Sequence, residues 1–148
     1  MDIRPILLED FDFDLWANVQ WLTAAQNMPK PERPLEVMGH IGWASDIWYS
    51  RVAGIPFEPD PKLEPSVFEA RTSLWKELLA KDDLDRIVSY RSLAGDPYRR
   101  TVEAIARHVI DHGTYHRGQL RGLAEAQQYE NFPETGLYLF FMDRRLYE

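Results

Sequence analysis

Apolar side chains recur at intervals of three and four residues in four separate stretches of the sequence. This spacing places them along one face of an α-helix, so each stretch is predicted to form a helix that packs against a core. The first predicted helix covers residues 7–27, with an apolar face formed by Leu8, Phe11, Leu15, Val19 and Leu22. Near its N-terminal end, where negative charge favours the helix dipole, lie Asp10, Asp12 and Asp14.

Proline-rich connections separate the next two predicted helices. Three prolines between residues 29 and 34 exclude a continuous helix there, and a second helix is predicted up to Gly54, which suits a left-handed cap. Four prolines between residues 55 and 65 predict a long crossover loop. A third helix is predicted over residues 66–80, with its inner face formed by Val67, Arg71, Leu74, Trp75, Leu78 and Leu79.

A small β-hairpin is predicted between the third and fourth helices. Ile87, Val88 and Tyr90 favour extended structure, and the sequence AGDP that follows is a turn signal. The fourth helix is predicted over residues 101–128, which contain no proline, with Thr101 as its N-cap. Its apolar stripe consists of Val102, Ile105, Val109, Leu120 and Leu123.

The C-terminal segment is too apolar to be a free tail. Pro133 is predicted to be the first residue of a short closing helix. The apolar side chains that follow are expected to pack on the bundle or on another subunit: Leu137, Phe140, Phe141 and Tyr147. Together these elements predict a single all-α domain over residues 1–148, a four-helix bundle with a crossover connection, a small hairpin and a short C-terminal helix.

Composition excludes several classes of function. The net charge of −7 and the pI near 5.1 argue against nucleic acid as a partner, because no basic patch is present to bind phosphates. The chain has no cysteine, so it forms no disulfide and supplies no thiol of its own. No signal peptide and no run of 18 apolar residues is visible, so we expect a cytoplasmic protein without a membrane span.

Histidines are concentrated in the predicted fourth helix. Three of the four histidines occur there at steps of four residues: His108, His112 and His116. The apolar stripe of this helix, continued through its middle, passes through His112 and His116 and so predicts that both face the core. Imidazoles four residues apart can converge on one metal ion. Spacing alone leaves the pair open between His108/His112 and His112/His116.

A lone inward histidine is more often a hydrogen-bonded core residue than a metal ligand. Two adjacent imidazoles are harder to accommodate, because they repel when protonated and each needs a polar partner when neutral. A divalent cation relieves both problems. The remaining histidine, His40, lies on or beside the apolar face of the second helix, where a third ligand is needed, and Trp43 and Trp48 flank it and can line a pocket.

Few residues close to the histidines in the sequence are suitable hydrogen-bond partners for the imidazoles. Gln119 lies close to the histidine stripe and can orient His116, whereas Asp111 and Arg117 are expected at the surface. No general base is evident, and Asp46 and Glu103 are candidates only because the predicted arrangement of helices places them near the histidines. Three glycines of this helix indicate either close packing or room for a ligand: Gly113, Gly118 and Gly122.

Four segments, in order along the chain, resemble the DinB family of metal-binding proteins. The most specific is HVIDHGTYHRGQL at residues 108–120, whose H-x-x-x-H-R-G-Q core is similar to the family's signature helix. The others are FDFDLWANVQWL, MGHIGWASDIWYSRVAG and FPETGLYLFFMDR. The resemblance implies a homodimeric four-helix bundle in which His40, His112 and His116 hold a divalent metal and His108 lies outside the ligand set.

The resemblance also implies a function. Some members of the family are transferases or isomerases that use a low-molecular-weight thiol such as bacillithiol or mycothiol. Three imidazoles suit zinc, nickel, iron or manganese and leave coordination positions open for a small-molecule substrate. The alternative is a non-catalytic bundle with a structural metal or a ligand- or partner-binding role.

Overall fold

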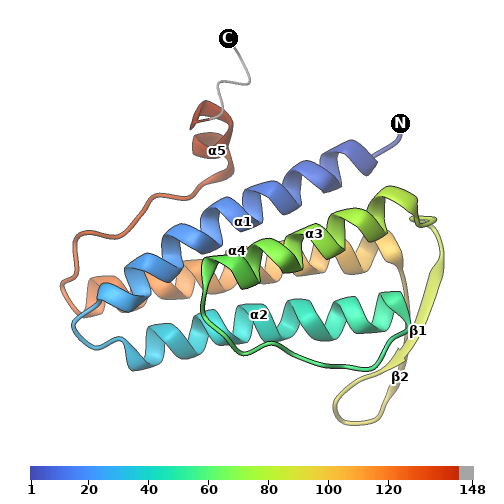
Figure 1. The fold of residues 1–148 in the computed structure, drawn as a ribbon, viewed down its shortest axis with the longest axis horizontal. Helices are drawn as coiled ribbons and strands as arrows, with labels where there is room; N and C mark the ends of the chain where they lie inside the picture. The colour runs from blue at the N-terminus through green and yellow to red at the C-terminus, as the bar shows by residue number, and fades with distance from the viewer. Residues whose placement is uncertain (144–148) are drawn as a thin grey trace.

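The computed structural model describes residues 1–143, and its main body is a bundle of four long helices (Figure 1). The elements are α1 (Arg4–Asn27), α2 (Glu32–Ala53), α3 (Pro65–Lys81), β1 (Ile87–Arg91), β2 (Pro97–Thr101), α4 (Val102–Ala126) and α5 (Leu137–Asp143). This order confirms the predicted bundle, hairpin and short closing helix. None of the helices within the described part of the chain has the length and apolarity needed to span a membrane.

The crossover between α2 and α3 sets the topology. Figure 1 shows the extended segment 55–64 running back along the bundle, so that α2 and α3 point in the same direction. The two strands then form an antiparallel hairpin at one end of the bundle, with Tyr90 paired with Tyr98. The hairpin leads directly into α4, whose N-cap is Thr101, since its side chain accepts a hydrogen bond from the Ala104 amide at 3.1 Å.

Helix α1 begins at Arg4, three residues earlier than the periodicity predicted, because Pro5 suits the first turn. As a result its first turn contains no acidic residue, and the predicted dipole role of the aspartates is wrong. The buried face also differs from the predicted one: Phe11 and Leu22 are buried, but Leu8, Leu15 and Val19 are only partly covered. α1 packs against α2, α3, α4 and α5, so its buried surface is wider than one stripe.

The hydrophobic core lies mainly in two clusters. Trp75 is central to one, where its ring stacks on Phe11 at 5.2 Å between centroids, and Trp21 belongs to the other. On α3 the prediction failed at Leu74, which is 47% exposed. The buried residues of α3 are Phe68, Arg71, Thr72, Trp75 and Leu79.

The C-terminal segment departs from the prediction in one respect. Pro133 lies in an extended connection, and α5 begins only at Leu137. Polar contacts help to hold this connection against the bundle: the Trp21 indole donates to Thr135 Oγ1 at 2.9 Å, and Arg121 pairs with Glu134 at 3.0 Å. Within α5, Phe140 is buried against Phe13, whereas the predicted packing residue Tyr147 lies outside the described residues.

The buried face of α4 is rotated relative to the predicted stripe. Between Val109 and Leu120, its buried positions are Gly113 and Arg117, and not His112 and His116. Arg117 is only 3% exposed, which corrects the prediction of a surface charge. The two histidines instead lie beside the buried face of α4 and are half-buried, so they are partly accessible to solvent.

A buried ion pair explains why Arg117 faces inward. Its guanidinium donates to Asp14 Oδ1 at 2.6 Å and to Asn18 Oδ1 at 2.7 Å, both on α1. Burial raises the pKa of Asp14, and the charge and hydrogen bond of Arg117 oppose that shift. Gly113 makes the contact possible, because a Cβ atom there would lie 2.5 Å from Asp14 Oδ1. This pair joins α4 to α1 through the residue that follows His116.

Candidate metal centre

Three imidazoles from two helices converge at the edge of the bundle. His40 comes from α2, while His112 and His116 come from successive turns of α4, which packs beside α2. The ring centroids lie 4.4–4.8 Å apart, and Nε2 of His40 is 3.1 Å from Nε2 of His112. One nitrogen from each ring falls within 4.8 Å of the others. His40 is exposed, so this histidine triad opens towards solvent.

The triad fits a divalent metal ion. In a tetrahedral site with metal–nitrogen distances near 2.0–2.1 Å, the nitrogens lie about 3.3 Å apart, which is close to the His40–His112 separation. Among residues 1–143 no carboxylate joins this group. Three neutral imidazoles leave at least one coordination position free, as in catalytic metal sites. The triad is therefore positioned to bind a metal.

His108 stands apart from the triad. Its ring centroid is 5.8 Å from that of His112, and it packs edge-to-face on Trp48 at 5.2 Å. The structure thus places His112 and His116, one of the two pairs that spacing left open, together with His40. His108 is exposed and lines a cavity beside the triad.

Electrostatics favour neutral imidazoles at His112 and His40. Burial, together with the neighbouring His116 and His40, lowers the pKa of His112 to about 4. Burial and the nearby His116 also lower the pKa of His40. At neutral pH both rings are consequently unprotonated and offer lone pairs, which is the state that a metal requires.

The protonation of His112 can be measured in the metal-free protein. We expect its imidazole to titrate near pH 4, because protonation there is opposed by burial and by the neighbouring imidazoles of His116, His40 and His108. An unfolded chain takes up this proton at about pH 6.5, so the metal-free fold should lose stability as the pH falls from 6.5 towards 4. Side-chain ¹H–¹⁵N NMR of the histidines tests this, and a His112 midpoint near 6.5 would contradict it.

Gln119 is hydrogen-bonded to one imidazole of the triad. Its Oε1 atom lies 2.8 Å from Nδ1 of His116, as the spacing predicted. An Nδ1–H donor in this hydrogen bond leaves Nε2 of His116 unprotonated and free to bind a metal. Support of this kind fixes both the tautomer and the rotation of the ring.

The other candidate residues have structural partners away from the triad. Asp46 accepts two hydrogen bonds from Arg71, at 2.6 and 3.1 Å, and Glu103 pairs with Arg107 at 3.1 Å. Asp111 is exposed, as predicted. Neither Asp46 nor Glu103 lines a cavity at the triad, so the structure gives no support to either as a general base there.

Two cavities flank the triad. The first, of about 380 Å³, is lined by His40 and His112 and extends between α2, α4 and the hairpin. The second, of about 550 Å³, is lined by His40 and His116 with Tyr115. Trp43 and Trp48 line the first cavity, as the sequence indicated. Small molecules can therefore approach the triad from two directions.

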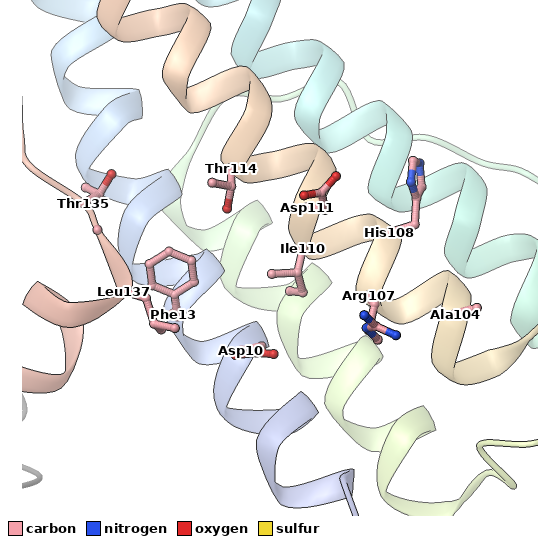
Figure 2. Close-up of a pocket in the computed structure, with 11 residues that line it drawn as sticks. Asp10, Phe13, Ala104, Arg107, His108, Ile110, Asp111, Thr114, Thr135 and Leu137 are labelled. Atoms are coloured by element: carbon pink, nitrogen blue, oxygen red, sulfur yellow. The ribbon is translucent and has the colours of Figure 1, made fainter.

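A larger cavity, of about 660 Å³, lies away from the triad (Figure 2). Figure 2 shows Phe13 of α1 beside Ile110 of α4, with Thr135 and Leu137 of the C-terminal segment at one end. Neither His40 nor the α4 ligands of the triad line it. Its volume alone does not make it the site of the chemistry, because the cluster of imidazoles lies elsewhere.

A four-helix bundle with a crossover, and with a histidine triad between α2 and α4 that could hold a metal, defines a class of helical proteins. Consistent with this, a model of the DinB superfamily matches residues 22–120, about two thirds of the chain. The chain belongs to the DinB superfamily. It is also 24% identical over 157 residues to Protein DinB from Bacillus subtilis (strain 168), an alignment that covers 88% of this chain and 91% of that protein.

Proposed function

We propose that this protein is a divalent-metal-dependent enzyme that joins a low-molecular-weight thiol to a small electrophilic substrate. His40, His112 and His116 would hold the metal, with zinc, nickel, iron and manganese as the candidates. The observation that carries the proposal is the pair of cavities on either side of an open triad. A reaction between two small molecules needs space for both beside one centre.

The chain would position the metal and the two small molecules, while the thiol supplies the nucleophile. A bound divalent ion would lower the pKa of a thiol and so favour its thiolate, which this cysteine-free chain cannot provide itself. In the proposed step, the sulfur forms a bond to an electrophilic carbon as the leaving group departs, and the thiol proton is released to solvent. Gln119 keeps the His116 ring in position throughout.

The activity is tested with metal-reconstituted protein and 1-chloro-2,4-dinitrobenzene as the electrophile. Bacillithiol, mycothiol and cysteine are offered as thiols, and chloride release accompanies formation of the sulfur–carbon bond. We expect turnover that disappears on chelation, returns with the metal and is lost in His112→Ala. Arg107→Ala is the matched control, because Arg107 is exposed on the same helix and pairs with Glu103. Turnover that survives in the metal-free protein would contradict the proposal.

One observation favours a second function, a non-catalytic bundle with a structural metal or a ligand-binding role. No aspartate or glutamate within the described part of the chain lines either cavity at the triad, so no carboxylate is placed to move a proton. This alternative predicts metal binding and thermal stabilisation without turnover of any thiol–electrophile pair.

Exposed apolar side chains on α5 support the further proposal of a homodimer. Tyr138 is 69% exposed and Met142 54% exposed, and Figure 1 shows α5 standing beside α1 at the edge of the bundle. Such side chains are covered when a second copy packs on them. Light scattering at micromolar concentration should give twice the chain mass of 17.4 kDa, and a mass of one chain would contradict the dimer.

A further inference from the structure

The cavity beside His40 and His112 has a distinct chemical character. It extends along α2 from His40 to Arg51, a distance of about 16 Å at the rise of an α-helix. Its volume of about 380 Å³ is in the range of small-molecule sites. Along α2, His40 of the triad lies at one end of this cavity and the basic side chain of Arg51 at the other, so its two ends differ in what they can bind.

Two arginines without acidic partners line this cavity, Arg51 on α2 and Arg100 on β2. Arg51 donates to the Arg91 carbonyl at 3.0 Å, and Arg100 donates to the Arg99 carbonyl at 2.7 Å. Within residues 1–143, neither guanidinium forms an ion pair, and no aspartate or glutamate lines the cavity. The charge of Arg51 is partly removed from water, and no carboxylate compensates it. This burial lowers the pKa of Arg51. This arrangement is unusual in a chain of net charge −7.

The walls between the two ends are aromatic. Trp48 of α2 contacts Tyr90 of β1 edge-to-face at 5.1 Å, and Tyr90 stacks on Tyr98 of β2 at 5.9 Å. The guanidinium of Arg51 lies 4.5 Å from the Trp48 ring and 4.8 Å from the Tyr90 ring. Tyr98 is 42% exposed and Leu93, nearby on the hairpin, is 78% exposed. A flat apolar ligand in the cavity would cover these side chains.

We infer that this cavity binds the non-thiol substrate, and that this substrate is a small, flat, apolar molecule with a carboxylate. Its carboxylate would pair with Arg51 and Arg100, its apolar body would lie against Trp48 and the tyrosines of the hairpin, and its reactive end would reach the triad. Arginine suits this role because its planar fork matches a carboxylate. The inference rests on the proposed function for the reaction, although the binding itself needs only the cavity.

Binding is tested with 4-phenylbutyrate and its neutral amide, using calorimetry on the protein with and without metal. We expect the acid to bind at least 10-fold more tightly than the amide, because a hydrogen bond to a charged group contributes more than one to a neutral group. Arg51→Leu should remove this preference, and Arg107→Leu, at an arginine outside the cavity, should retain it. Circular dichroism confirms folding, and Arg100→Leu is the second variant if Arg51→Leu does not fold.

The outcomes separate this inference from the proposed function. Equal affinity for acid and amide, or an unchanged preference in Arg51→Leu, would overturn the carboxylate site. A preference that persists in Arg51→Leu and disappears without metal would mean that the carboxylate binds at the triad, which also overturns it. If the preference depends on Arg51 in metal-free protein but no turnover is found, the carboxylate site stands and the enzymatic proposal fails.

Discussion

Substitution of Arg117 by methionine is expected to lower the free energy of unfolding by about 3–5 kcal/mol, because it leaves a buried carboxylate without its cation. The side chain of Arg117 is only 4% exposed. Asp14 accepts a hydrogen bond from the Arg117 guanidinium at 2.6 Å. Asn18 also loses a donor, since Arg117 contacts its Oδ1 at 2.7 Å. Urea unfolding followed by circular dichroism measures this loss.

Arg121→Met provides the matched control, four residues further along α4. Arg121 pairs with Glu125 and Glu134, but its side chain is 46% exposed, so the substitution should change stability little. Replacing Arg117 and Asp14 together by methionine and leucine should recover much of the loss, because no buried charge then remains unpaired. Equal effects of the Arg117 and Arg121 substitutions would show that the buried pair is not the main contact between α1 and α4.

Metal binding at the triad is expected to raise the melting temperature strongly. A ligand at about 1,000 times its dissociation constant stabilises the folded state by about 4 kcal/mol. For a chain of this size that corresponds to a shift of roughly 8–16 °C. Differential scanning fluorimetry of the chelated protein, with zinc, nickel, iron(II) or manganese added back in turn, measures the shift and ranks the metals.

Two histidine variants show where such stabilisation originates. His112→Ala removes the central ligand of the triad and should abolish the shift. His108→Ala removes the same side chain one turn away, outside the triad, and should retain it. A shift of the same size in both variants would mean that the metal binds elsewhere on the protein.

Helical periodicity predicted the fold well because each long helix buries a face of ordinary apolar residues. It was less accurate at helix ends and at buried positions on helices with several neighbours. Pro133 resembled a helix start, but its segment is tied to the bundle by Thr135 and Glu134, contacts that local sequence does not display. On α1, the buried positions include Asp14, Ala17 and Asn18, which a count of large apolar residues passes over, and Leu15 is only partly buried.

The histidines were predictable as a cluster, although their orientation was not. Between Val109 and Leu120 the buried positions of α4 hold Gly113 and Arg117, which a count of apolar residues passes over. The true partner of Arg117 is Asp14, more than 100 positions away along the chain, so nothing near α4 marked it as buried. The spacing of Asp14 and Asn18, four residues apart on α1, was the available signal.

The prediction of the three histidines as metal ligands used two kinds of information. Spacing left two histidine pairs open, and resemblance to the DinB family selected His112 and His116 together with His40. The structure brings these three rings together and sets His108 against Trp48. Membership of the superfamily specifies no substrate, so the chemistry of the cavity at Arg51 is the stronger guide to what this protein binds.

The most direct test of a metal centre at the triad is elemental analysis of the protein purified without a metal-affinity step, beside His112→Ala and His108→Ala. The triad predicts about one first-row transition metal per chain in the unaltered protein and in His108→Ala, and none in His112→Ala. Absence of metal from all three proteins, even after reconstitution, would contradict the account and leave the histidines as residues of a ligand pocket.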